Sequence, residues 1–170
     1  MPLSRLLEPD LFLGGSILNL TRETIEKYHL QGLVLDVDET LVPLKENQVS
    51  QDIQQWVTNI KEIATLSLVS NNLVESRIAA IAESLDLPYI SNAAKPSRRK
   101  LNKAVKAMEL PVERIAMVGD RLLTDVLAGN RLGMFTILVE PMVDPTQGSG
   151  IYRLRSFEVW ISQILGASLH

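Results

Sequence analysis

The sequence predicts an α/β fold of three layers, in which a mainly parallel β-sheet lies between two layers of helices. Five short apolar runs alternate with segments that have helical periodicity. The first of these runs, residues 33–35, is apolar without interruption, which is typical of a strand covered on both faces. Parallel neighbours need crossover connections, and the intervening segments are long enough to supply them as helices.

The predicted elements follow one another in a regular order. Strands are expected at 33–35, 66–69, 89–90, 115–118 and 135–139, which gives a five-stranded sheet. Ser50 is a suitable N-cap for a first helix, whose buried stripe comprises Ile53, Trp56, Val57 and Ile60. A second helix ends before Pro88 and carries Ile78, Ile81, Ala82 and Leu85. Further helices are expected at about 97–108 and 122–132.

The length of 170 residues predicts a single domain that can bury its own core. We expect the core at about 32–140, with residues 1–31 and a C-terminal helix at about 151–166 as appendages. The N-terminal segment does not resemble a signal peptide, because Glu8, Pro9 and Asp10 interrupt it. No apolar stretch is long enough to span a bilayer, so the expected location is cytoplasmic, with membrane contact at most peripheral.

Composition excludes several functional classes. The formal net charge of -3 argues against bulk nucleic-acid binding. The absence of cysteine excludes disulfides, thiolate zinc sites and a cysteine nucleophile. His29 and His170 are the only histidines, and neither stands in a ligand pair or beside a candidate serine. Histidine-dependent hydrolysis is therefore a poor explanation of the chain.

Four groups of polar residues stand at or just beyond the ends of apolar runs. Asp36, Asp38 and Thr40 follow the first strand, and Ser70 and Asn71 follow the second. Lys95 and Pro96 lie after the third strand, and Gly119, Asp120 and Asp125 lie at the end of the fourth. Ligands of parallel sheets bind beyond the carboxyl ends of the strands, so these groups are expected to share one site.

The carboxylates of this set suit phosphoryl transfer through an aspartyl-phosphate. We assign Asp36 as the nucleophile, and Asp38 as the acid that protonates the leaving oxygen and then the base that activates water. Asp120 can join Asp36 on a hard cation, for which Mg²⁺ is the natural choice. Asp125 either reaches the metal or orients a ligand around it. Taken singly, each of these residues could equally cap a turn or a helix.

The remaining polar groups are predicted to bind phosphate. Thr40, Ser70 and Asn71 offer hydroxyl, amide and backbone N–H groups, and the Lys95 ammonium can offset phosphate charge. A strand-to-helix turn would use the same residue types, and exposed lysines are common. The order of the four groups and their shared edge of the sheet favour one functional site over independent turns.

Asp36-x-Asp38-x-Thr40, Ser70, Lys95-Pro96 and Gly119-Asp120-x4-Asp125 resemble the four motifs of the haloacid dehalogenase (HAD) superfamily of phosphatases. The match covers about residues 32–140. The resemblance implies a Rossmann-like sheet with strand order 5-4-1-2-3, a magnesium-dependent aspartyl-phosphate mechanism, and the residue roles given above. It also implies that Asp38 offers its backbone carbonyl to the metal.

Many HAD enzymes carry an inserted cap domain, and this chain has little room for one. Only 31 residues separate Asp38 from Ser70, and 24 separate Ser70 from Lys95. We therefore expect a capless enzyme with an open site, which suits a phosphate carried on something large: a protein, a nucleic acid or a lipid at a membrane surface.

The segment from Gly32 to Leu41, with Ser70-Asn71-Asn72 and Asn19-Leu20-Thr21, is similar to the YqeG-like branch of this superfamily. That branch includes the mitochondrial-type phosphatidylglycerophosphate phosphatases of phospholipid biosynthesis. Glu39 stands where that pattern has Asn. The resemblance implies hydrolysis of phosphatidylglycerophosphate to phosphatidylglycerol.

Other features bear on an anionic phospholipid as the partner. A basic cluster at the predicted mouth of the site comprises Lys95, Arg98, Arg99, Lys100, Lys103 and Lys106, and either attracts headgroups or forms a solvated helix face. Apolar residues near the N-terminus either pack on the sheet or insert at an interface, with packing favoured. Those of the C-terminal helix belong to the core, to a dimer contact or to an interfacial anchor.

Three alternatives stay open. The substrate could be a soluble phosphomonoester or phosphoprotein. The chain could instead be a non-catalytic scaffold that binds phosphate groups, although the presence of both Asp36 and Asp38 speaks against this. A receiver-like module phosphorylated on aspartate shares the architecture but leaves Asp38 without a role.

Overall fold

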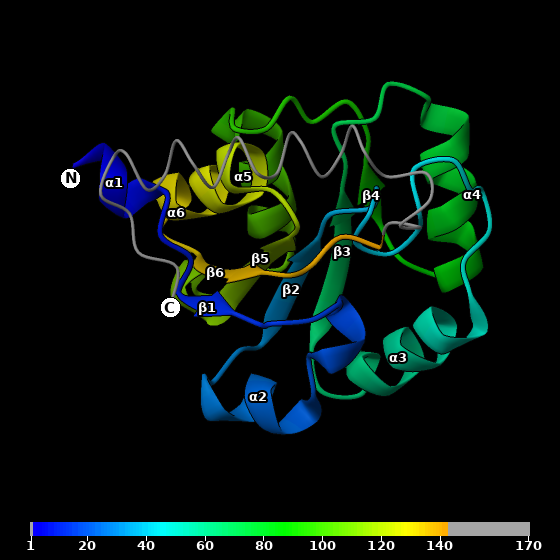
Figure 1. Cartoon of the computed structure of the whole chain (residues 1–170), viewed down its shortest axis with the longest axis horizontal. Coiled ribbons are helices and arrows are strands. Elements are labelled where there is room, and N and C mark those ends of the chain that lie inside the picture. Colours follow the sequence, from blue (N-terminus) through cyan, green and yellow to red (C-terminus); the bar gives the residue numbers. More distant parts are fainter. Residues whose placement is uncertain (1, 143–170) are drawn as a thin grey trace.

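A computed structural model of the protein describes residues 2–142. It confirms the α/β class: six parallel strands form one sheet in the order β1-β6-β5-β2-β3-β4 (Figure 1). The strands are β1 (Leu11–Phe12), β2 (Gly32–Leu35), β3 (Thr65–Val69), β4 (Tyr89–Ile90), β5 (Ile115–Gly119) and β6 (Phe135–Leu138). The α-helices are α1 (Leu3–Leu6), α2 (Arg22–Lys27), α3 (Gln51–Lys61), α4 (Glu75–Leu85), α5 (Arg98–Ala107) and α6 (Leu127–Leu132). Two 3₁₀ turns, Ile17–Asn19 and Val112–Arg114, complete the connections.

The three predicted layers follow from the alternation of side chains along the central strand β2. Leu33 and Leu35 point into the larger core, which they share with apolar residues of α2, α3 and α4. Val34 points to the opposite face, where it packs with residues of α5 and α6. Helices therefore cover both faces of the sheet (Figure 1). Burial on both sides explains why β2 contains apolar residues and one glycine and no charged residue.

The sheet has one strand more than the five predicted. β1 pairs in parallel with β6, with Leu11 opposite Ile137 and Phe12 opposite Leu138. Two residues are too few to show a strand period, so nothing local distinguished this segment from a loop. The other five strands have the order implied by the HAD resemblance, and β1 extends the sheet at its β6 edge.

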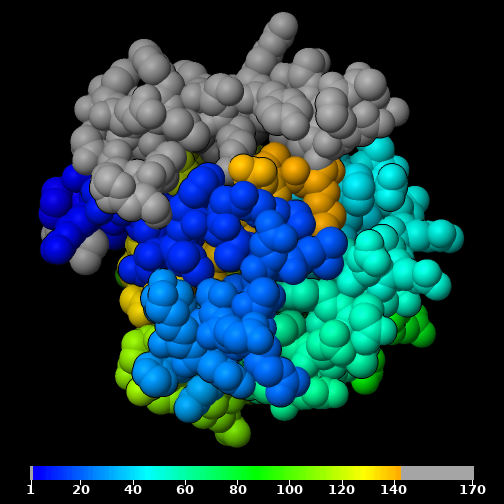
Figure 2. Space-filling view, turned by 60° about the horizontal axis from the view of Figure 1, so that its bottom comes forward, coloured from blue at the N-terminus to red at the C-terminus, as the bar shows by residue number. Residues whose placement is uncertain are grey.

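The N-terminal segment packs on the sheet, as favoured from the sequence. Leu7 is buried, whereas Leu3 is exposed. Beyond β1, the backbone N–H of Glu140 donates to the carbonyl of Gly15 at 2.9 Å. Figure 2 shows the blue N-terminal residues lying against the orange residues around position 140. The segment thereby covers the edge of the sheet next to β6.

The predicted helices are present, with one local difference. The Ser50 hydroxyl caps α3 by accepting a hydrogen bond from the Ile53 N–H, as predicted. The helix predicted at 122–132 begins instead as a π-helical turn, Leu122–Val126, before it continues as α6. The amides of both Asp125 and Val126 donate to the Arg121 carbonyl. Such wide turns are common at functional sites, and this one carries Asp125. The helix predicted at about 151–166 lies outside the described residues.

The connections at the carboxyl edge of the sheet are short. Residues 36–50 join β2 to α3, residues 70–74 join β3 to α4, and residues 91–97 join β4 to α5. None of these described segments holds an inserted domain, which agrees with the capless prediction. Within residues 2–142, no helix has the length and apolar character needed to cross a membrane.

Candidate active site

The structure brings all four sequence motifs to the carboxyl edge of the sheet. Asp36 follows β2, Ser70 follows β3, Lys95 lies five residues beyond β4, and Asp120 follows β5. β2 lies between β5 and β3, so Asp36 occupies the centre of this edge. Parallel strands that end together explain why residues separated by up to 84 positions meet at one place.

Three carboxylates converge there. Asp36, Asp120 and Asp125 each place one oxygen within 4.8 Å of the others, and all three residues are buried. Gly119 makes this convergence possible, because a Cβ at that position would lie 2.2 Å from Oδ2 of Asp125. The π-helical turn also directs Asp125 back toward β5, and its Oδ2 accepts a hydrogen bond from the Arg121 N–H at 3.3 Å.

One ammonium group lies among these carboxylates. Nζ of Lys95 donates to Oδ1 of Asp125 at 2.6 Å, to Oδ1 of Asp36 at 3.0 Å and to the Val69 carbonyl at 2.8 Å. The Asn71 side chain fixes the backbone of residue 95: its Oδ1 accepts from the Lys95 N–H at 2.7 Å, and its Nδ2 donates to the Lys95 carbonyl at 2.9 Å. Lys95, predicted both to bind phosphate and to belong to the basic cluster at the mouth of the site, is thus a buried residue that contacts Asp36 and Asp125.

Crowding of buried negative charge perturbs the acid groups. Burial, and then repulsion from Asp36 and Asp125, raises the pKa of Asp120 to about 9. Burial and repulsion from Asp36 raise the pKa of Asp125 to about 7, against the opposing effect of Lys95. Burial alone would lower the pKa of Lys95, but Asp125 and Asp36 raise it above its usual range. Lys95 therefore stays protonated.

The cluster fits a hard divalent cation. Three carboxylates face one ammonium, so full ionisation leaves an excess of negative charge in a buried place. Carboxylate oxygens are the ligands that Mg²⁺ and Ca²⁺ prefer. The raised pKa values of Asp120 and Asp125 indicate that ionisation of these carboxyls is unfavourable without a cation, and a bound cation would favour their ionised forms.

Thr40 and Ser70 border the cluster. The Thr40 hydroxyl lies 3.5 Å from both Oδ2 of Asp36 and Oδ1 of Asp120. The Ser70 hydroxyl is buried and accepts a hydrogen bond from the Asn72 N–H at 3.0 Å. Of the four predicted phosphate binders, Thr40 and Lys95 contact Asp36, Asn71 fixes the backbone of Lys95, and Ser70 follows the neighbouring strand β3.

Asp38 lies beside the cluster, held by two residues that the sequence analysis did not assign to it. Its Oδ1 accepts from Arg77 at 2.5 Å, and its Oδ2 accepts from the Asn72 side chain at 2.9 Å. Arg77 lies at the start of α4, 39 positions from Asp38. One signal in the sequence could have identified Arg77: it stands at the start of a helix that follows a motif at the functional edge.

Glu39 is a second unexpected feature. Its side chain is buried, and Oε1 accepts a hydrogen bond from the Leu44 N–H. Oε2 has no hydrogen-bond partner among the described residues. Burial raises the pKa of this carboxyl, and the neighbouring Asp38 adds to the effect. The backbone has φ of 64° at Glu39, in the left-handed region that Asn tolerates better than Glu.

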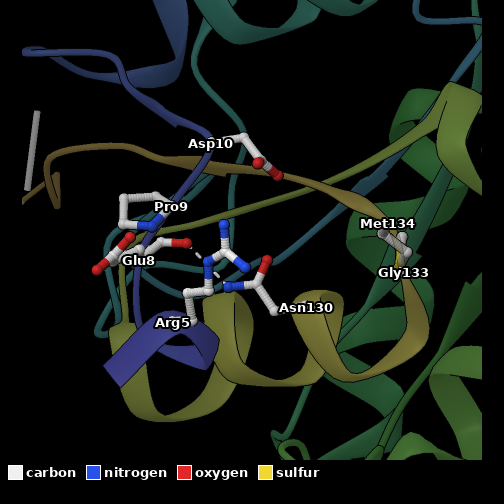
Figure 3. Close-up of a pocket in the computed structure, with 7 residues that line it drawn as sticks. All are labelled: Arg5, Glu8, Pro9, Asp10, Asn130, Gly133 and Met134. Atoms are coloured by element: carbon white, nitrogen blue, oxygen red, sulfur yellow. Dashed lines mark hydrogen bonds between the residues drawn. The ribbon is translucent and has the colours of Figure 1, made fainter. Parts of the chain in front are cut away.

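Two surface pockets lie away from the acidic cluster. One pocket, of about 410 Å³, is lined by residues of α1, of the segment that precedes β1 and of the end of α6, and Figure 3 shows these residues. Beside it, the Asn130 side chain donates to the carbonyls of Leu6 and Glu8. The pocket lies near the amino end of β6, opposite the functional edge. A second pocket, of about 570 Å³, lies beside the 70–74 loop and is lined by Leu73, Glu75, Tyr89, Ile90, Ser91, Asn92 and Lys100.

Comparison with known proteins agrees with this geometry. A family model described as HAD-hydrolase-like matches residues 92–143. The probable phosphatase YqeG of Bacillus subtilis is 38% identical over 141 residues, which cover 82% of this chain and 81% of that protein. The chloroplastic phosphatidylglycerophosphate phosphatase 1 of Chlamydomonas reinhardtii is 28% identical over 150 residues, which cover 82% of this chain and 56% of that protein.

A solved structure supports the fold. The crystal structure of a haloacid dehalogenase-like family hydrolase from Xanthomonas campestris has a TM-score of 0.50 at 14% identity, covering 79% of this chain and 98% of that one. The similarity to YqeG extends over most of both chains and includes the segments that form the carboxylate cluster. The chain therefore belongs to the YqeG-type phosphatases of the HAD-like hydrolase family.

Proposed function

We propose that this phosphatase is a magnesium-dependent phosphomonoester hydrolase that works through an aspartyl-phosphate on Asp36, and that its substrate is phosphatidylglycerophosphate. The observation that carries the chemistry is the convergence of the Asp36, Asp120 and Asp125 carboxylates around the Lys95 ammonium. The relatives named as phosphatidylglycerophosphate phosphatases support the substrate, at 28% and 23% identity.

The Asp36, Asp120 and Asp125 carboxylates would hold Mg²⁺, together with the backbone carbonyl of Asp38. When bound, Mg²⁺ supplies positive charge that offsets the charge of the phosphate and of these carboxylates. Lys95 already contributes one fixed cation beside Asp36 and keeps one oxygen of that carboxylate in place through the 3.0 Å contact. Thr40, Ser70 and Asn71 would orient the phosphate oxygens.

The reaction then proceeds in two displacements. A carboxylate oxygen of Asp36 attacks phosphorus, the bond from phosphorus to the ester oxygen breaks, and Asp38 donates a proton to that leaving oxygen. Asp38, now a carboxylate, takes a proton from water as the water attacks the phosphorus of the aspartyl-phosphate. Inorganic phosphate leaves, and both Asp36 and Asp38 return to their starting states.

The rim of the site suits a substrate held at a membrane surface. Leu73 is 76% exposed, Val74 is 55% exposed and Leu44 is 46% exposed. Their backbones are linked to the residues that hold Asp38: Asn72 binds Asp38, precedes Leu73 and accepts from the Val74 N–H, and Arg77 binds both Asp38 and the Leu44 carbonyl. Exposed apolar residues beside an open site favour contact with lipid. A cytoplasmic protein would make this contact as a peripheral membrane protein.

The direct test is phosphate release by purified protein. With Mg²⁺, detergent-dispersed phosphatidylglycerophosphate should be hydrolysed in preference to a panel of soluble sugar phosphates and phosphopeptides. Asp36→Asn should abolish turnover, whereas Asp52→Asn, which changes an exposed acid on α3, should not. Equal or better turnover of small sugar phosphates would reject the lipid assignment, and full activity of Asp36→Asn would reject the nucleophile.

A second measurement tests the rim. The double variant Leu73→Ser/Val74→Ser should lower turnover of phosphatidylglycerophosphate in vesicles and leave hydrolysis of p-nitrophenyl phosphate unchanged. Leu18→Ser, an exposed leucine in the N-terminal segment, is the matched control. An equal effect of the rim variant on both substrates would argue against lipid contact at this surface.

A further inference from the structure

We propose that Arg77 is a positioning residue that orients the Asp38 carboxylate and ties it to the turn at residues 43–47. This inference rests on the proposed function, in which Asp38 transfers the proton of the leaving oxygen. Arg77 lies in the first turn of α4, directly after the loop that carries Ser70 and Asn72. A single side chain there contacts both Asp38 and residues 43–47 of the connection between β2 and α3.

The first contact is with Asp38. Nη1 of Arg77 lies 2.5 Å from Oδ1 of Asp38, and the two side chains are only 10% and 20% exposed. Hydrogen bonds from a charged donor such as guanidinium are stronger than neutral ones, and limited exposure reduces their screening by salt. This contact therefore constrains the carboxylate far more than an exposed surface pair would.

The second contact is with the turn. Nη2 of Arg77 donates to the Glu46 carbonyl at 2.8 Å, and Nε donates to Oδ1 of Asn47 at 3.2 Å. The carbonyls of Pro43 and Leu44 lie 3.4 Å from Nη2. Arginine suits this task because its guanidinium presents five donors in one plane, whereas a lysine ammonium cannot bridge two separated acceptors in the same way.

The other oxygen of Asp38 is fixed from the same side. Nδ2 of Asn72 donates to Oδ2 of Asp38 at 2.9 Å, and Oδ1 of Asn72 accepts from the Val74 N–H at 2.8 Å. Both donors thus come from the chain that follows β3, although Asp38 itself follows β2. The orientation of Asp38 is consequently set by the junction of β3 and α4.

This arrangement keeps the Arg77 guanidinium apart from the carboxylate cluster. Among the described residues, the hydrogen bonds of the Arg77 guanidinium go to Asp38 and to residues 43–47, and none goes to Asp36, Asp120 or Asp125. Loss of Arg77 should therefore misplace Asp38 and leave the carboxylate cluster intact. General acid catalysis matters most when the leaving group is a poor one, such as an alkoxide.

The experiment compares two substrates in the same enzyme. kcat/KM is measured with Mg²⁺ for an alkyl phosphomonoester, phosphatidylglycerophosphate in detergent, and for p-nitrophenyl phosphate, whose leaving group needs little protonation. Arg77→Ala should lower kcat/KM for the alkyl ester roughly 100-fold and for the aryl ester by only a few fold. Arg22→Ala, which removes an exposed ion pair with Glu62, should change neither value.

Two further variants make the test decisive. Arg77→Lys keeps the charge but cannot bind Asp38 and the Glu46 carbonyl at the same time. It should therefore show the same selective loss to a smaller extent. If Arg77→Ala does not fold, Arg77→Lys takes its place in the test. In an Asp38→Asn background, Arg77→Ala should cause no further selective loss, because the group it positions is already inactive. Added guanidinium should partly restore alkyl ester turnover in Arg77→Ala.

The outcomes are distinct. An equal loss of kcat/KM on both substrates, or an additive loss in the double variant, would mean that Arg77 only stabilises the fold. Either result would overturn the inference and leave the phosphatase assignment unaffected. A wild-type protein that hydrolyses neither substrate would overturn the proposed function and this positioning role with it.

Discussion

Nζ of Lys95 lies 2.6 Å from Oδ1 of Asp125, and both side chains are only 1% exposed. The same ammonium also binds Oδ1 of Asp36, which occupies the centre of the functional edge, at 3.0 Å. A buried cation between two carboxylates, with a third carboxylate nearby, determines how the site responds to substitution, to pH and to metal.

Lys95→Met should destabilise the metal-free protein strongly, because it leaves three carboxylates buried without a cation. Breaking a buried pair typically costs about 3–5 kcal/mol, a large part of the stability of a domain of this size. Urea unfolding with and without Mg²⁺ measures the effect, and Mg²⁺ should restore part of the loss. Lys61→Met, which removes a pair with the fully exposed Asp86, should change stability by less than about 1 kcal/mol. Equal effects of the two variants would contradict the assigned importance of Lys95.

Mg²⁺ should stabilise the protein more at pH 9 than at pH 6. Burial and mutual repulsion raise the pKa of Asp120 to about 9 and that of Asp125 to about 7, so both bind protons more tightly in the folded protein than in the unfolded chain. The metal-free protein therefore loses stability as the pH rises from about 4 through these values. Metal ligation needs the deprotonated carboxylates, so competition from protons falls over the same range.

Thermal unfolding in buffers of equal ionic strength measures this difference, with EDTA as the metal-free reference. Asp120→Asn should remove most of the Mg²⁺ shift and reduce the loss of stability with pH. A Mg²⁺ shift of the same size at both pH values, or one that persists in Asp120→Asn, would argue against metal binding at this cluster.

Gly119→Ala should impair the site through Asp125. The added Cβ would lie 2.2 Å from Oδ2 and 2.3 Å from Cγ of Asp125, so the carboxylate must move. We expect a loss of roughly 1–3 kcal/mol in the free energy of unfolding together with weaker Mg²⁺ binding. Gly32→Ala is the matched control. Its Cβ would lie 2.8 Å from Sδ of the flexible Met108 side chain, and residue 32 stands at the opposite end of β2 from Asp36. Unchanged Mg²⁺ binding in Gly119→Ala would show that Asp125 is not needed for the metal.

Glu39→Gln should make stability less dependent on pH. Burial raises the pKa of Glu39, so the folded protein binds this proton more tightly than the unfolded chain does, and stability falls as the pH rises from the unfolded pKa toward the folded one. Glutamine stays neutral and keeps an oxygen that can accept from the Leu44 N–H. The difference in the free energy of unfolding between pH 5 and pH 8, measured in urea, should be smaller in the variant.

Glu83→Gln, an exposed change on α4, is the control for the Glu39 experiment. It should leave the pH dependence of the wild-type protein unchanged. If Glu39→Gln also leaves that dependence unchanged, the pKa of Glu39 is not raised by folding.

Local patterns in the sequence determined the strands from β2 to β6, the helices α3 to α5, and the set of polar residues at the carboxyl edge. Apolar runs, helical spacing and the Ser50 cap depend on neighbours within a few residues, so the chain itself displays them. The meeting of Asp36, Lys95 and Asp120 also followed from the sequence, because parallel strands end at one edge whatever the details of packing.

The tertiary structure alone decided the features that depend on distant contacts. β1 is a strand only because β6 offers it a free edge, and two residues carry no period of their own. The direct ion pairs of the buried Lys95 ammonium with Asp36 and Asp125 are a further tertiary feature, and so is the contact of Arg77 with Asp38 across 39 positions. Ion pairs of this kind form when packing brings two elements together, and residue type or spacing does not encode that approach.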